Sequence, residues 1–347
     1  MRTMKRYIAA FLFLVLAAAC DNPLEYRPKD TSKKLIMNSL LEVGADTHAV
    51  YLGISTTNGI EAVQSGEVKC YVNGKLAAVA VHADAHEWPE MESAFYTFME
   101  PYLFTAGFAA GDEVRLEATA NGGSYKASAT ITVLPLPELK NVSVQEVTET
   151  VGEEVETLCK FSITVQDSDP GQNYYRLSVS YLYHATGFAG GERIGESDGR
   201  VNCWLDASGD PVLSDSGFSS PQAEDALFQL DTPNYYGIFS DLSFNGKSVT
   251  LRPSTIPVSF WDLAPAFDYG SDMIEVEGSF CVEVSRLSEK YYYYLKAVNA
   301  LFGDSAFFAL EDISLPNNID GGMGFAGMTN PERRILELPV SKLVPTY

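Results

Sequence analysis

EVKCYVNGKLAAVAV, residues 67–81, carries the strongest hairpin signal in the chain. Two runs that alternate apolar and polar residues flank the pair Asn73-Gly74. A type I′ turn between two strands requires a positive φ at both of its central residues, and Asn and Gly adopt that conformation most readily. The stretch therefore predicts two antiparallel strands joined by a two-residue turn.

Five more strand-like segments surround this hairpin between residues 33 and 134, and Gly122-Gly123 marks a second hairpin. They are KLIMNSLL (34–41), AVYLGIST (49–56), SAFYTFM (93–99), DEVRLEATA (112–120) and SYKASATITV (124–133). Seven short strands in about 100 residues are typical of an immunoglobulin-like antiparallel β-sandwich. The Cys–Trp–Cys pattern of true immunoglobulin domains is absent from this stretch, so the prediction covers the architecture alone.

A proline-rich segment at residues 135–139 follows the predicted sandwich. Each proline removes a ladder donor and stiffens the chain, which suits a short linker between domains. Residues 140–347 are again mostly strand-like and predict a larger β-rich C-terminal domain. Its candidate strands are NVSVQEV (141–147), LCKFSITVQD (158–167), YYRLSVSYLYH (174–184), RVNCWL (200–205), KSVTLRP (247–253), IEVEGSFCVEVS (274–285) and RRILELPV (333–340).

One or two helices are expected in the second domain. A short helix begins after Ser220, with Pro221 at its first position. For the other helix, Ser288 is a suitable N-cap and Gly303 fits the position just past the C-terminus. Its apolar face is formed by residues at helical spacing, namely Tyr291, Leu295, Val298 and Phe302. Tyr293 then lies on the exposed side and is a candidate ligand-stacking residue, although core packing is the preferred interpretation of this tyrosine run.

The first 19 residues read as a signal peptide that ends at Cys20. Three cations precede an apolar run of about 13 residues, too short to cross a bilayer as a helix. Small residues lead directly into Cys20, as in a bacterial lipobox, although Ala17 stands where most lipoboxes carry Leu. We predict that Cys20 is acylated with diacylglyceryl and palmitate chains and that residues 20–32 form a flexible tether above the outer membrane. The periplasmic and the surface-exposed face of that membrane both stay open.

The chain is strongly acidic, with 46 Asp and Glu against 24 Lys and Arg and a formal net charge of −22. Three of these cations lie in the leader, so its removal makes the mature chain more acidic still. Such a surface repels phosphate backbones, which excludes nucleic acid as an expected partner. It also argues against membrane binding through a basic patch, so the lipid must provide the attachment.

Four cysteines follow Cys20, and none of them belongs to a Cys-x-x-Cys pair. A zinc knuckle or a redox motif is therefore not expected. Three of the four alternate with apolar residues and are predicted to be buried, whereas Cys281 falls on the opposite face of its strand from Phe280 and Val282. An exported protein can form disulfides, and the sequence leaves the pairing of these cysteines open: Cys70, Cys159, Cys203 and Cys281.

The segment Gly195-Glu-Ser-Asp-Gly199 matches the GxSxG pattern of serine hydrolases. A nucleophile elbow requires a strand before it, a helix after it and a later histidine. Here a strand-like segment follows, and His184 is the last histidine of the chain. Ser197 therefore reads as a serine in a loop, and no catalytic residue is predicted.

Two polar clusters resemble metal sites, but neither is predicted to bind a metal. His82 and His86, with Asp84 and Glu87 between and beside them, lack an evident helix and a further ligand. Residues 167–171, Asp-Ser-Asp-Pro-Gly, match the start of a calcium loop but lack the later glutamate. Asx turns between strands are the preferred interpretation of that segment.

Several motifs resemble the Bacteroidota lipoprotein family called domain of unknown function 4249. They occur in order along nearly the whole mature chain: Cys20, KLIMNSLL, YVNGK, GDEVRLEA, DPGQNYYRL, DPVL, FSDLSFNGK, LSEKYYYYLKA and NNIDGGMGFAG. In the last motif the glycines, with Asn318, suit a tight turn before a terminal strand.

The resemblance implies a cell-envelope accessory protein, since members of this family look like companions of TonB-dependent receptors. It transfers no site residues and no cofactor. The first hypothesis is a non-enzymatic outer-membrane lipoprotein that binds a partner protein or nutrient. A glycan-binding surface lipoprotein is the alternative, suggested by the tyrosine-rich stretches, and a hydrolase is the third.

Overall fold

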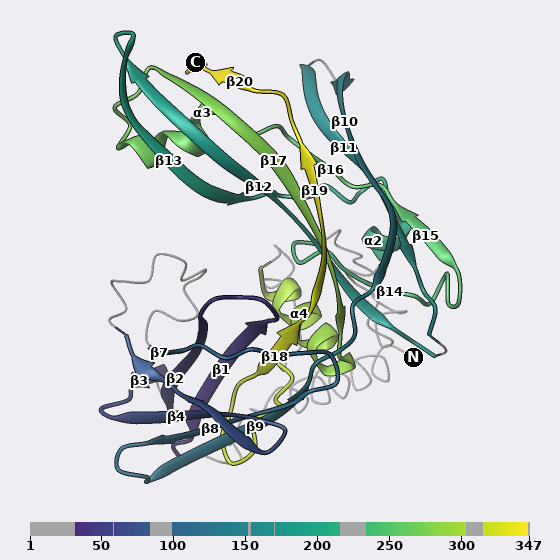
Figure 1. Ribbon diagram of the computed structural model, residues 1–347. Coiled ribbons are helices and arrows are strands. Elements are labelled where there is room, and N and C mark those ends of the chain that lie inside the picture. Colours follow the sequence, from purple (N-terminus) through teal and green to yellow (C-terminus); the bar gives the residue numbers. More distant parts are fainter. Residues whose placement is uncertain are drawn as a thin grey trace, which may run out of the picture.

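Strands dominate the computed structural model, which describes residues 32–57, 59–83, 99–151, 154–169, 171–215, 234–302 and 315–345. Figure 1 shows a smaller β-body below and a set of long, curved strands above. The prediction of a mainly β chain is confirmed. Among the described residues, no helix is long and apolar enough to cross a membrane.

The smaller body is a sandwich of two sheets. The first contains, in spatial order, β18 (Ala326–Thr329), β1 (Leu35–Glu42), β2 (His48–Thr56), β7 (Glu100–Phe104) and β6 (Val81–His82), with β3 (Gly59–Ala62) beside β2. The second contains β5 (Lys75–Val79), β4 (Gly66–Val72), β8 (Glu113–Ala120) and β9 (Tyr125–Thr132). Side chains from both sheets share one core, among them Leu35 and Leu52 from the first and Val68 and Leu116 from the second. This shared core is what makes the two sheets a sandwich.

The predicted hairpin at Asn73-Gly74 is confirmed. These two residues have φ values of 50° and 75°, and Val72 pairs with Lys75 across the turn. The strand expected at residues 93–99 lies almost entirely outside the described residues, and β7 begins at Glu100 instead.

The C-terminal part of the chain returns to this sandwich and corrects the predicted division between domains. Strand β18 lies parallel to β1, with Ser39 opposite Ala326, and Ile319 is buried in the sandwich core. At Gly324, where φ is +117°, a Cβ atom would lie 2.4 Å from the carbonyl oxygen of Met37. Only glycine allows this close approach. The sandwich therefore includes residues beyond the predicted range of 33–134.

The long strands form two further sheets. One contains β10 (Glu138–Val151), β11 (Glu154–Gln166) and β15 (Ser248–Leu251), with β16 (Ser254–Thr255) beside β11. The other contains β13 (Glu192–Asn202), β12 (Tyr174–Ala189), β17 (Met273–Leu287) and β19 (Pro331–Glu337), with β14 (Ile238–Ser240) beside β12 and β20 (Ser341–Leu343) beside β17. Both sheets contribute to one core, for example Phe161 and Ile163 from the first and Phe280 from the second. Three short helices accompany them: α2 (Pro211–Asp215), α3 (Phe260–Leu263) and the 3-10 helix η4 (Ala264–Phe267).

Helix α4 (Glu289–Phe302) packs where the two bodies meet (Figure 1). The predicted cap is present, because the hydroxyl of Ser288 accepts a bond of 3.2 Å from the backbone N–H of Tyr291. Its buried face packs with Tyr174 of β12 and with Phe325, next to β18. The proposed helix end at Gly303 and the short helix at 220–230 lie outside the described residues.

An ion-pair network also joins the two bodies, and Glu283 of β17 is its centre. The Glu283 carboxylate accepts bonds of 2.6 Å from Nε of Arg333 and 2.7 Å from Nη2 of Arg200. Arg333 bonds in turn to Glu42 on β1. The side chain of Glu283 is 6% exposed, so this charge is stabilised by the two arginines rather than by water.

Candidate functional site

A groove lies between the outer face of β1 and helix α4. Alternation along β1 creates it, because Leu35, Met37 and Leu41 point into the sandwich core while the residues between them point outward. The groove has a volume of about 540 Å³. Its lining includes Ile36, Asn38, Leu40 and Glu42 from β1, Tyr294, Leu295 and Val298 from α4, and Tyr51, Tyr236, Leu315 and Met323 from other segments.

The groove is apolar and aromatic in character. Leu40, Leu315 and Met323 are 43%, 39% and 44% exposed although they are large apolar side chains. Tyr294 stacks on Phe325 with ring centroids 4.2 Å apart and an interplanar angle of 10°. Burial, followed by the neighbouring tyrosines, raises the pKa of Tyr294 to about 12, so this ring stays neutral at physiological pH. Apolar walls with a few polar groups are typical of small-molecule sites.

Tyr293, the residue singled out from the sequence, does not line this groove. It is 40% exposed, in agreement with its expected place on the outer side of the helix. Its ring packs against Tyr174 and Tyr292, with centroid distances of 6.0 and 5.4 Å. Its ligand-stacking role stays a prediction. Sequence reasoning missed Tyr294, whose signal was its i, i+4 spacing from Val298.

The hydrolase motif has no elbow geometry. Residues 195–199 lie within β13, where Ser197 pairs with Ala185 of β12, so the interpretation of Ser197 as a loop residue was wrong. His184 pairs with Asp198 at 2.8 Å. Because successive side chains of a strand point to opposite faces, Ser197 and Asp198 lie on opposite sides of the sheet. His184 is therefore not positioned to activate Ser197.

The histidine cluster is described only at its first member. Nε2 of His82 on β6 lies 2.7 Å from the Glu100 carboxylate, whereas His86, Asp84 and Glu87 lie outside the described residues. Across the described ranges, no three His, Cys, Asp or Glu side chains form an arrangement that could hold a metal ion.

The cysteines of the two bodies are free thiols. Cys70, Cys159 and Cys281 are buried and Cys203 is partly buried. Burial raises the pKa of Cys70 to about 11, and burial, followed by Cys159, raises the pKa of Cys203 to about 12. Such thiols are unreactive at neutral pH. Cys20, the predicted acylation site, lies outside the described residues.

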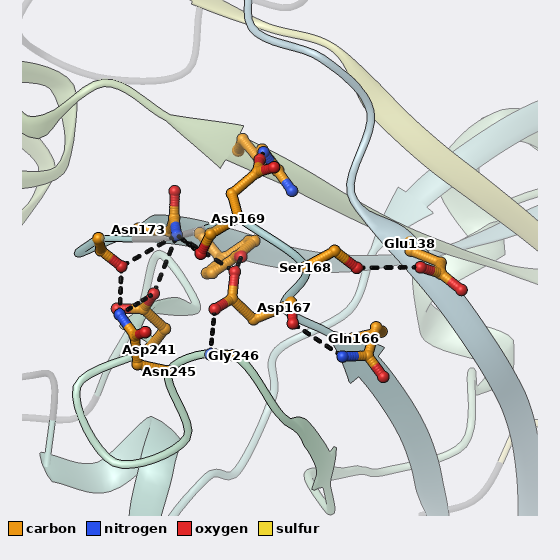
Figure 2. A network of polar contacts seen from close by, with 12 residues as sticks. Glu138, Gln166, Asp167, Ser168, Asp169, Asn173, Asp241, Asn245 and Gly246 are labelled. Carbon is orange, nitrogen blue, oxygen red and sulfur yellow. Dashed lines mark hydrogen bonds and ion pairs between the residues drawn. The ribbon is translucent and has the colours of Figure 1, made fainter.

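A polar cluster lies where β11 and β14 end, and Figure 2 shows it from close by. Asp167 and Asp241 are both fully buried. The Asp167 carboxylate accepts bonds from Tyr175 Oη at 2.9 Å and from the backbone N–H of Gly246 at 2.6 Å. The partners of Asp167 thus include groups up to 79 residues away, so an Asx turn within its own segment does not describe its environment.

Asn173 and Asn245 complete this cluster. Asn173 Nδ2 lies 3.1 Å from Oδ1 of Asp167 and 3.0 Å from Oδ2 of Asp241. Asn245 Nδ2 lies 3.2 Å from the same Asp241 oxygen and also contacts the carbonyl oxygen of Gly171. Asp241 is therefore close to this segment in space, although it is 68 residues from Asn173 in the sequence.

Two of the solved structures that resemble this chain do so only weakly. The adhesin InvE of Yersinia pseudotuberculosis is 13% identical, with 88% of this chain and 58% of that chain covered and a TM-score of 0.19. Bovine butyrophilin is 10% identical, with 71% of this chain and 91% of that chain covered and a TM-score of 0.18. This chain thus spans less than two thirds of the adhesin. At these TM-scores neither similarity supports an argument about fold or function.

A search of the curated proteins gives no match. A family profile does match, and its description is "Domain of unknown function (DUF4249)". The match extends over residues 21–335, which includes helix α4 and every strand of the two bodies except the end of β19 and β20. The chain belongs to the DUF4249 family.

Proposed function

We propose that this chain is a non-enzymatic, lipid-anchored binding protein of the cell envelope that serves a TonB-dependent uptake receptor. The groove between β1 and α4 is the observation that carries the binding role. Its volume of about 540 Å³ lies within the range of about 300–1,000 Å³ that is usual for small-molecule sites. Stacked rings and apolar walls favour a ligand with a flat or apolar part.

The anchor is supported by the sequence of the leader. The short apolar run and the small residues before Cys20 suit a lipoprotein signal. Two or three acyl chains hold a soluble domain stably on a membrane, whereas one chain binds only marginally. The acidic chain provides no alternative attachment, because an anionic leaflet repels it.

The attachment and the partner are tested together by replacing Cys20. The wild-type protein is expected in the outer-membrane fraction, and affinity capture from solubilised membranes is expected to recover a TonB-dependent receptor. Cys20→Ser is expected to release the chain into the soluble fraction. Sedimentation of the variant with membranes, or capture without any such receptor, contradicts this part of the proposal.

The groove is tested with a neutral fluorescent probe, N-phenyl-1-naphthylamine, because a charged probe would also respond to the acidic surface. Tyr294→Ala removes the stacked ring and is expected to reduce saturable probe binding by about 2- to 13-fold, since one aromatic contact contributes roughly 0.5–1.5 kcal/mol. Tyr293→Ala is the matched control on the same helix and is expected to bind as the wild type. Equal binding by all three proteins rules out the groove as the ligand site.

Glycan binding is the second candidate, favoured by the exposed ring of Tyr293 beside Tyr292 and Tyr174. Aromatic faces of this kind can stack on sugar rings. A glycan array distinguishes the two candidates: loss of a glycan signal in Tyr293→Ala, with Tyr294→Ala unaffected, favours the glycan surface over the groove.

A further inference from the structure

Several oxygens of the cluster around Asp167 and Asp241 share one amide donor. Asn173 Nδ2 lies within 3.0–3.4 Å of four oxygens, which belong to the carboxylates of Asp167 and Asp241 and to the carbonyls of Asp169 and Gly171. A side-chain amide has only two hydrogens to donate. The Asn173 amide therefore cannot donate to all four oxygens at once.

One buried oxygen has no partner at all within the described residues. Asp241 is 0% exposed, and its Oδ1 atom has no hydrogen-bond partner there. Figure 2 shows the Asp241 side chain directed at Asn173 and Asn245, and its Oδ2 atom bonds to both. Leaving a buried carboxylate oxygen without a partner is unfavourable, so a further positive group at this oxygen would stabilise the cluster.

The charges of the cluster also favour a bound cation. Asp167 and Asp241 bring two fully buried carboxylates to the same asparagine amide. In the part of the chain that the structure describes, the ion pair beside them joins Arg286 to Asp169 and not to either of these carboxylates. A single divalent cation would balance the two carboxylates.

We propose that this cluster is a calcium site that joins the loops following β11 and β14. Turning each asparagine amide by half a turn exchanges its nitrogen for its oxygen within the same outline. The cluster then offers six oxygens, which meets the six to eight that Ca²⁺ takes. The ligands are the carboxylates of Asp167 and Asp241, the amide oxygens of Asn173 and Asn245, and the carbonyl oxygens of Asp169 and Gly171.

The ligand chemistry selects calcium over other ions. All six ligands are oxygens, which disfavours zinc and copper, and neutral carbonyl and amide oxygens on loops suit Ca²⁺ better than the strict octahedron of Mg²⁺. Only two carboxylates coordinate directly, in keeping with the absence, among the described residues, of three clustered acidic, thiol or imidazole side chains that could hold a metal. The segment continues into Tyr174, which packs on Tyr292 of α4, so the ion would stiffen the contact of β12 with that helix.

Calcium binding is measured on the detergent-solubilised full chain after removal of metals with EDTA. Isothermal titration with CaCl₂ is expected to give one bound ion per chain, and saturating Ca²⁺ is expected to raise the unfolding temperature by several degrees. Equimolar MgCl₂ is expected to do neither. Absence of Ca²⁺ binding at millimolar concentration in the wild-type protein overturns the proposal.

Variants distinguish a calcium site from a cluster that is stabilised by amide hydrogen bonds alone. Asp241→Asn is expected to weaken Ca²⁺ binding more than about 100-fold, yet to raise the unfolding temperature in EDTA, because it removes a buried charge that has no partner. Asp198→Asn is the control, since that side chain is 82% exposed, and it is expected to leave Ca²⁺ binding unchanged. Wild-type affinity in Asp241→Asn, or a lower unfolding temperature in EDTA, contradicts the calcium site.

Discussion

Replacing Glu283 with Gln is expected to destabilise the joint between the two bodies. The substitution keeps the shape of the side chain but removes the charge that Arg200 and Arg333 share. It also directs an NH₂ group at two guanidinium groups, which donate and cannot accept. The link from Glu42 on β1 through Arg333 to β17 then loses its central anion.

The expected loss in the free energy of unfolding is about 2 kcal/mol. Removing one partner of a buried ion pair usually costs about 3–5 kcal/mol. Here Glu283 is buried, but the side chains of Arg200 and Arg333 are 44% and 38% exposed, so water can solvate them once the carboxylate is gone. We therefore take about half of that range. At about 2–4 °C per kcal/mol for a chain of this size, the unfolding temperature falls by about 4–8 °C.

The pH dependence has a definite sign. Burial tends to raise the pKa of Glu283, but its bonds to Arg333 and Arg200 outweigh burial and hold the pKa below its ordinary value of 4.5. Because the folded-state pKa is the lower one, the stabilisation is present above the unfolded-state pKa and is lost as the pH falls through the folded-state pKa. The difference between wild type and Glu283→Gln is therefore expected to be full at pH 7 and to shrink below about pH 4.5.

Thermal unfolding followed by circular dichroism at pH 7 and pH 4 measures both effects. Glu149→Gln is the control, since Glu149 pairs with Lys160 on the surface and both side chains are more than one third exposed. Its effect is expected to stay within about 0.5 kcal/mol. The reasoning fails if Glu283→Gln matches this control, or if its deficit is the same at both pH values.

Two further substitutions test the packing of each body. In Gly278→Ala a Cβ atom would lie 1.9 Å from Oη of Tyr181, a buried ring, so the free energy of unfolding in urea is expected to fall by about 1–3 kcal/mol. Gly195→Ala is the control, because its Cβ would meet nothing closer than 4.0 Å. Equal losses in the two variants contradict the clash. Phe325→Ala removes a side chain that is 1% exposed and stacks on Tyr294. It is expected to lower the free energy of unfolding by about 3–5 kcal/mol and to abolish probe binding. Unchanged probe binding contradicts the role of this stack.

Local signals in the sequence predicted the elements whose cause is local. The hairpin followed from Asn73-Gly74, because adjacent positive φ values restrict the residue choice. The start of α4 followed from Ser288, which satisfies a backbone donor of its own first turn. The interpretation of Ser197 failed for a physical reason: β13 lies at the edge of its sheet, so its exposed polar and glycine residues show no buried periodicity.

The remaining features depend on contacts between distant segments, and a single sequence contains no periodic pattern that predicts such contacts. All four residues of β18 are buried, so the strand lacks the alternation of buried and exposed residues that would predict it. Its position beside β1 requires contacts between residues about 290 positions apart, such as the bond between Asn38 and Phe325. The groove and the Asp167 cluster also depend on contacts between segments that are distant in the sequence. One needs α4 opposite β1, and the other needs Asp241 beside Asp167, so neither exists until segments that are distant in the sequence have packed together. A ligand or an ion that binds such a site stabilises the folded chain, because the unfolded chain does not bind it.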